Sequence, residues 1–174
     1  MTIEHATSGD LKHIRALVER YTRDVPTDPW SETPDALAVA IEKIIDNPAY
    51  LVLVGRDRSG IMGFLLAELK NDPIARTFVA VVHAAWVDPA YRGRAFFPSG
   101  AQIRDKALHI LTVWARSKGA THLACLAERG AAMERLLGWT YRGAYRGRDF
   151  LMCNIETNVP KVVTEDGRRP EPTL

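Results

Sequence analysis

The sequence has few cysteines, little net charge and no long apolar run, and each of these absences excludes a class of protein. Two cysteines in 174 residues, Cys125 and Cys153, are too few for a disulfide framework. Both fall in apolar, strand-like segments, so we expect buried thiols and no metal site. A formal charge of +2 gives no reason to expect nucleic acid or an anionic membrane as partner.

Long apolar segments are also missing. No stretch reaches the roughly 20 apolar residues that span a bilayer, and residues 1–5 have neither the basic nor the apolar part of a secretory signal. We therefore expect a cytoplasmic protein, free or incorporated in a larger assembly, with no membrane partner.

The remaining composition predicts one domain and a tail. Hydrophobic residues make up 47% of the chain, enough for a single core, which we place in residues 1–156. Residues 157–174 are polar, contain three prolines and show no periodicity. This extended C-terminal tail cannot bury enough apolar surface to fold alone. We expect that its own domain, a second copy of the chain or an assembly partner orders it.

Periodicity and turn residues predict a mixed α/β domain without internal repeats. Helices are expected after the start signal Thr7–Asp10, between Pro34 and Asn47, from Gly100 to Gly119, and over residues 131–137. Strands are expected over residues 2–6, 50–54, 61–69, 78–87, 121–127, 139–145 and 150–156, with turns at 57–60 and 146–148.

One stretch carries most of the functional information. Residues 87–94 read Val-Asp-Pro-Ala-Tyr-Arg-Gly-Arg, and a long amphipathic helix follows them. A strand that ends in an Arg/Gly loop before a helix N-terminus favours phosphate binding, because backbone N–H groups and the positive end of the helix dipole converge there. Ser99 and Gln102 form a capping box, so we expect the helix to begin at Gly100.

This stretch resembles the cofactor loop of the GNAT N-acetyltransferases, Val-x-Pro-x-Tyr-Arg-Gly-x-Gly-x-Gly. The element order resembles that family over residues 1–156, as does Leu137-Gly138-Trp139 after the last helix. The resemblance implies a GNAT-like acyl-CoA N-acyltransferase fold, with a central twisted, mostly antiparallel sheet flanked by helices. It implies acetyl-CoA as cofactor, bound by Val87, Arg92, Gly93, Arg94, Ser99, Gly100 and Ala101.

The match breaks after Arg94. Ala95 and Phe97 stand where the family has glycines that let the backbone approach phosphate, and Pro98 removes a further N–H donor. Two interpretations stay open: a slightly displaced anion pocket, or a loop in which the adjacent phenylalanines 96 and 97 fill the site.

The catalytic groups of the family are also changed. Direct attack by an amine requires a base to accept its proton. The family often supplies a Glu on the long strand and a Tyr in the last helix. In this sequence residues 78–87 contain no carboxylate, and His83 is the candidate base there. The position of the Tyr is occupied by Glu134. His83 is either the base or a hydrogen-bonded strand histidine. Glu134 is either an acid or base facing the site or a solvated surface residue.

A basic and aromatic cluster marks the last expected hairpin. Arg142, Arg146 and Arg148 alternate there with Tyr141 and Tyr145. Such a cluster can receive an acidic substrate or a partner surface, and the ordinary alternative is a solvated hairpin tip.

The leading hypothesis is an acetyl-CoA-dependent N-acyltransferase homologue that acts on a small-molecule or peptide amine. The alternative is a catalytically silent structural or interaction protein, such as a virion or assembly component, that docks through residues 157–174. A third hypothesis is a sensor that binds coenzyme A or a nucleotide without reacting.

Overall fold

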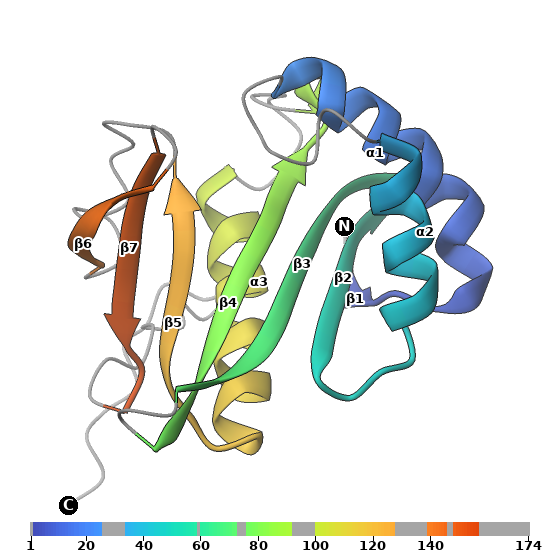
Figure 1. The fold of residues 1–174 in the computed structure, drawn as a ribbon. Helices are drawn as coiled ribbons and strands as arrows, with labels where there is room; N and C mark the ends of the chain where they lie inside the picture. The colour runs from blue at the N-terminus through green and yellow to red at the C-terminus, as the bar shows by residue number, and fades with distance from the viewer. Residues whose placement is uncertain are drawn as a thin grey trace, which may run out of the picture.

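The computed structural model describes residues 2–25, 34–58, 60–72, 76–91, 100–127, 139–145 and 148–156. These residues form a sheet with helices on both of its faces (Figure 1). The strands are β1 (Thr2–His5), β2 (Tyr50–Asp57), β3 (Gly60–Asp72), β4 (Thr77–Val87), β5 (Ala120–Ala127), β6 (Thr140–Tyr145) and β7 (Arg148–Asn154). The helices are η1 (Ser8–Asp10), α1 (Leu11–Asp24), α2 (Pro34–Ile44), η3 (Pro89–Tyr91) and α3 (Gly100–Ser117).

Helix α1 starts where the sequence predicts it. The Asp10 carboxylate accepts hydrogen bonds from the Thr7 backbone N–H at 2.9 Å and from the Thr7 hydroxyl at 3.0 Å. These bonds hold the 3-10 turn η1, which leads directly into α1. The predicted start of α2 at Pro34 and that of α3 at Gly100 are also confirmed.

The sheet has seven strands in the order β1-β2-β3-β4-β5-β7-β6. Strands β4 and β5 are parallel, and every other neighbouring pair in this order is antiparallel. The predicted mixed fold with a mostly antiparallel sheet is therefore confirmed. One detail of the prediction is wrong: Arg148, placed in a turn, is the first residue of β7 and pairs with Tyr145.

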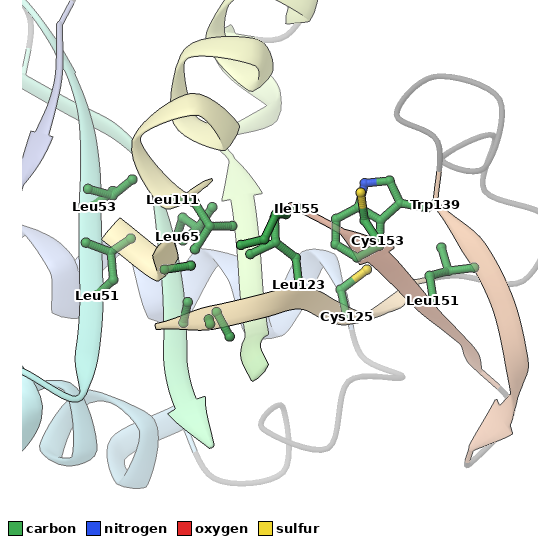
Figure 2. Close-up of a cluster of buried hydrophobic side chains, with 14 of the residues drawn as sticks. Leu51, Leu53, Leu65, Leu111, Leu123, Cys125, Trp139, Leu151, Cys153 and Ile155 are labelled. Carbon is green, nitrogen blue, oxygen red and sulfur yellow. The ribbon is translucent and has the colours of Figure 1, made fainter. Parts of the chain in front are cut away.

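The two faces of the sheet carry separate cores. Helices α1 and α2 cover β2, β3 and β4, and there the Tyr21 ring packs edge-on against Phe64 and Trp86, with centroid distances of 5.6 and 6.3 Å. Helix α3 covers the other face, where Leu111 is fully buried (Figure 2). Cys125 and Cys153 lie in this second core as free thiols, which confirms their predicted burial.

None of the helices in the described ranges is long and apolar enough to cross a membrane.

Candidate functional site

Strands β4 and β5 pair over only part of their lengths. The pairing runs from Phe78 and Ala120 to Val82 and Cys125, after which β4 continues to Val87 and β5 to Ala127. The ends of the two strands diverge in Figure 1. We call the region between residues 83–87 of β4 and residues 126–127 of β5 the strand opening.

Backbone groups from both strands face the strand opening. Residues of an antiparallel strand direct their N–H and C=O groups alternately to one neighbour and to the other. The Asp88 N–H donates to the Met62 carbonyl at 2.8 Å, so the backbone groups of Asp88 are directed toward β3. By the same alternation, the backbone groups of Ala85 and Val87 are directed toward the strand opening. This places Val87, a predicted cofactor-binding residue, at the edge of the strand opening.

The same alternation of backbone groups applies to β5, on the other side of the strand opening. The Ile155 N–H donates to the Thr121 carbonyl at 3.0 Å, which continues the pairing of β5 with β7. The odd-numbered residues of β5 therefore direct their backbone N–H and C=O groups toward β7, and Leu126 directs its own toward β4. Backbone N–H and C=O groups of both strands are thus directed toward the strand opening, and the Leu126 carbonyl among them accepts a hydrogen bond from Arg148 Nη2 at 3.1 Å.

A β-bulge places His83 at the start of the strand opening. Leu66 and Ala67 of β3 pair with Ala84 and Val82 of β4, so His83 is the extra residue between two ladder positions. Val82 packs with the α3 core, whereas Ala84 belongs to the α1/α2 core. Bulges commonly re-aim a side chain at a functional site, and this one turns the imidazole to the α1/α2 face.

The imidazole has an acidic partner on the neighbouring strand. His83 Nε2 lies 2.8 Å from Glu68 Oε2, and about one fifth of each side chain is exposed (22% and 21%). The family resemblance implies a carboxylate on the long strand, which has none, but β3 places Glu68 beside it. Glu68 could not be predicted because the contact depends on the register of β3 against β4. The available indication was that Glu68 interrupts the otherwise apolar residues 61–69.

Two further groups bind Glu68. The Tyr50 hydroxyl donates to Glu68 Oε1 at 3.2 Å, and Lys70 Nζ lies 3.0 Å from Oε2. Burial alone would raise the pKa of Glu68, but the hydrogen bonds from His83 and Lys70 outweigh it and hold the pKa below its ordinary value. Burial, followed by the charge of Glu68, raises the pKa of Tyr50. Glu68 is therefore an anion beside His83 at neutral pH.

The segment after β4 is fixed by Asp88, whose side chain is buried. Its Oδ2 accepts a hydrogen bond from Arg20 Nη1 of α1 at 2.5 Å, and its Oδ1 accepts from the Ala90 N–H at 2.9 Å. The Asp88 carbonyl accepts from the Tyr91 N–H and closes the turn η3. These bonds set the direction in which the chain leaves β4 toward the predicted phosphate loop.

Several predicted site residues lie outside the described residues: Arg92, Gly93, Arg94 and Ser99 of the loop, and Glu134. The phenylalanines 96 and 97, on which the two interpretations of the loop differ, lie outside them as well. Gly100 and Ala101 are the first residues of α3, as predicted. Within the described part of the chain, His83 and Val87 both lie on β4 beside the strand opening, and the roles of all these residues stay predictions.

The last hairpin differs from a fully solvated tip. Arg142 of β6 is exposed, in line with that reading, but Arg148 is partly buried and its Nη2 donates to the Leu126 carbonyl at 3.1 Å. Arg146 lies outside the described residues.

No protein-family profile and no curated protein matches the chain, but many solved structures share its fold. A ribosomal-protein-alanine N-acetyltransferase from Brucella melitensis has 22% sequence identity and a TM-score of 0.62, and the match covers 87% of this chain and 97% of that one. A GNAT superfamily phosphinothricin acetyltransferase from Sinorhizobium meliloti, in complex with AcCoA, has 20% identity, a TM-score of 0.64, and coverage of 88% and 87%. A PaiA N-acetyltransferase from Thermoplasma acidophilum, in complex with coenzyme A, has 14% identity, a TM-score of 0.59, and coverage of 88% and 99%.

These similarities establish the fold of the chain as that of the GNAT acyl-CoA N-acyltransferases, which the sequence motif at residues 87–94 predicts. The low identities agree with a divergent sequence. A fold alone does not determine an activity, so the chemistry has to be argued from the site.

Proposed function

We propose that this chain is an acetyl-CoA-dependent N-acetyltransferase whose acceptor is a small-molecule or peptide amine. The observation that carries the proposal is the His83–Glu68 pair, held by a bulge at the start of the strand opening. Structures with the same fold include acetyltransferases in complex with acetyl-CoA or coenzyme A, which supports the choice of cofactor.

The chain offers suitable groups for this cofactor. Acetyl-CoA would supply an acetyl group activated as a thioester. Its pantetheine arm carries amides, and the backbone groups of Ala85, which are directed toward the strand opening, are the proposed partners of those amides. The loop residues 92–94 and the start of α3 at 99–101 are the proposed phosphate site, since anions bind at helix N-termini.

His83 is the proposed general base. Glu68 is ionised at neutral pH and lies 2.8 Å from Nε2 of His83, so it favours the tautomer that carries its hydrogen on Nε2. The imidazole of His83 is the group that we propose to accept the proton of the amine. Glu68 fixes the orientation of the ring and stabilises the imidazolium that forms, as a carboxylate does beside other catalytic histidines. Glu68 is therefore a positioning residue.

Calorimetry and kinetics test the proposal together. We expect acetyl-CoA to bind the purified chain with micromolar affinity and Arg92→Ala to abolish that binding. Release of free coenzyme A is then followed with a panel of polyamines, amino acids and peptides with free N-termini. His83→Gln should lower kcat/KM about 100-fold or more and leave the Kd for acetyl-CoA unchanged, because the variant loses only the proton acceptor.

The matched control is His122→Gln. His122 lies on the adjacent strand β5 and hydrogen-bonds Thr121 at 2.9 Å, so its replacement should leave the rate unchanged. Transfer by His83→Gln at the wild-type rate would show that His83 is not the base. Absence of acetyl-CoA binding at millimolar concentration would overturn the proposal and favour the non-catalytic interaction protein, whose partner should then depend on residues 157–174.

A further inference from the structure

Helix α1 binds the end of β4 through two side chains on one face of the helix. Arg20 Nη1 donates to Asp88 Oδ2 at 2.5 Å. Asp24 Oδ2 accepts a hydrogen bond from the indole Nε1 of Trp86 at 2.7 Å. Arg20 and Asp24 are one helical turn apart, and Trp86 and Asp88 are alternate residues of an extended segment. Helix α1 therefore holds the chain at two successive positions where β4 ends.

The two contacts hold different parts of this segment. Strand β4 pairs with β3 up to Val87, and Gly63 of β3 lies so close to it that a Cβ there would be 2.6 Å from the Trp86 carbonyl oxygen. Asp88 is the first residue after the strand, and its Oδ1 accepts from the Ala90 N–H at 2.9 Å. The Asp88 carboxylate thus joins α1 to the turn η3. Its loss should release the residues after Val87 and leave the strand in place.

The partners of this ion pair differ in burial. The exposed fraction of the side chain is 56% for Arg20 and 8% for Asp88. A hydrogen bond between a guanidinium and a carboxylate is charge-assisted, and it is screened less where one partner is shielded from water. The pair is therefore suited to fix the turn η3. Replacement of the exposed Arg20 would break the pair without opening a cavity.

We infer that Asp88, held by Arg20, is a positioning residue for the phosphates of acetyl-CoA. This inference rests on the proposed function and deepens it, because it assigns part of the cofactor affinity to residues outside the proposed phosphate site. The Tyr91 N–H donates to the Asp88 carbonyl at 2.8 Å, and the proposed phosphate loop 92–94 follows directly. A loop whose entry is fixed in advance loses less conformational freedom when it binds a ligand, so it binds more tightly.

Two ligands separate the phosphates from the rest of the cofactor. Acetyl-CoA and S-acetylpantetheine share the thioester and the pantetheine arm, but only acetyl-CoA carries phosphates. Calorimetry for acetyl-CoA and NMR titration for the weaker S-acetylpantetheine give the two Kd values on the full chain. Asp88→Asn should weaken acetyl-CoA binding by about 10-fold or more. Its Kd for S-acetylpantetheine should equal that of the wild type, because β4 keeps its pairing with β3.

Variants of Arg20 test the ion pair from the side of the helix. Arg20→Met removes the guanidinium that Asp88 binds and should weaken acetyl-CoA binding as Asp88→Asn does, so it serves if the asparagine variant does not fold. Arg20→Lys keeps the positive charge but loses the planar fork, so it should restore part of the affinity.

Asp10→Asn is the matched control at the opposite end of α1. The Asp10 side chain is 9% exposed, and it accepts hydrogen bonds from Arg56 Nη2 at 2.6 Å and from the Thr7 N–H at 2.9 Å. The variant therefore disturbs the same kinds of bonds at similar burial. Its Kd for acetyl-CoA should stay that of the wild type.

The outcomes separate this inference from the proposed function. Equal weakening of both ligands in Asp88→Asn would overturn the inference, as would equal weakening of acetyl-CoA binding in Asp10→Asn. Wild-type affinity for acetyl-CoA in both Asp88→Asn and Arg20→Met would overturn the inference and leave the proposed function intact. A selective loss of acetyl-CoA affinity in a chain that transfers acetyl to no amine would support the inference and contradict the activity.

Discussion

Replacing Gly63 with alanine tests how closely β3 and β4 approach beside the strand opening. Gly63 pairs with Val87, and a Cβ at position 63 would lie 2.6 Å from the Trp86 carbonyl oxygen and 3.2 Å from Val87 Cα. Both are backbone atoms, so rotation of a side chain cannot relieve the clash. The end of β4 would have to move away from β3, toward the side where the cofactor is proposed to bind.

The expected magnitude follows from the cost of overpacking a well-packed interior, typically about 1–3 kcal/mol. Because the clash is with backbone atoms, we expect Gly63→Ala to lower the free energy of unfolding by about 2–3 kcal/mol in urea titrations. The m-value, the slope of that free energy against urea concentration, should stay unchanged. Displacement of Ala85 and Val87 should also weaken acetyl-CoA binding in calorimetry.

Gly55→Ala is the matched control in the same sheet. Its Cβ would meet only Met62 Cγ, at an ordinary van der Waals distance of 3.8 Å. There the loss of freedom in the unfolded chain should dominate and raise stability by about 0.4–1 kcal/mol. If Gly63→Ala proved as stable as Gly55→Ala, the close approach of the two strands, and the reasoning from it, would be refuted.

Three further predictions concern the cores and the titrating groups. Leu111→Ala, at a fully buried position of α3, should lower the free energy of unfolding by about 2–5 kcal/mol, whereas the exposed Val113→Ala should change it by under about 0.5 kcal/mol. Glu68→Gln should cost about 1 kcal/mol at neutral pH. Because the pKa of Glu68 is lowered in the folded state, this difference from wild type should shrink as pH falls through that pKa, and a pH-independent difference would contradict the assignment. Cys125 and Cys153, whose pKa values are raised by burial, should react with a thiol reagent only after unfolding, and rapid labelling of the native protein would contradict their placement.

Most elements of this fold could be predicted because their determinants are local. Thr7 and Asp10 start a helix through contacts three residues apart, and Pro34 marks the start of α2 in the same local way. The resemblance at residues 87–94 then gives the topology that local patterns leave open. Element ends were less predictable: β2 continues to Asp57, beyond the expected Val54, because it pairs with β3 up to the turn.

The site was less accessible to sequence reasoning, since its geometry depends on register. The contact between His83 and Glu68 requires β3 and β4 in a particular alignment and one extra residue in β4, and periodicity does not reveal a bulge. Arg148 was assigned to a turn because its neighbours Arg146 and Gly147 have turn chemistry. Its hydrogen bond to Leu126 spans two strands and leaves no trace in the local sequence.

The bulge has a consequence for a deletion at residue 83. Because residue 83 is an insertion between two ladder positions, a chain lacking it would have Val82 followed directly by Ala84, and these two already point to opposite faces, as neighbours in a regular strand must. Such a deletion would leave the side chains of both hydrophobic layers in place while it removes the proposed base. A chain shortened by this one residue should therefore keep its fold and lose the transfer activity proposed above.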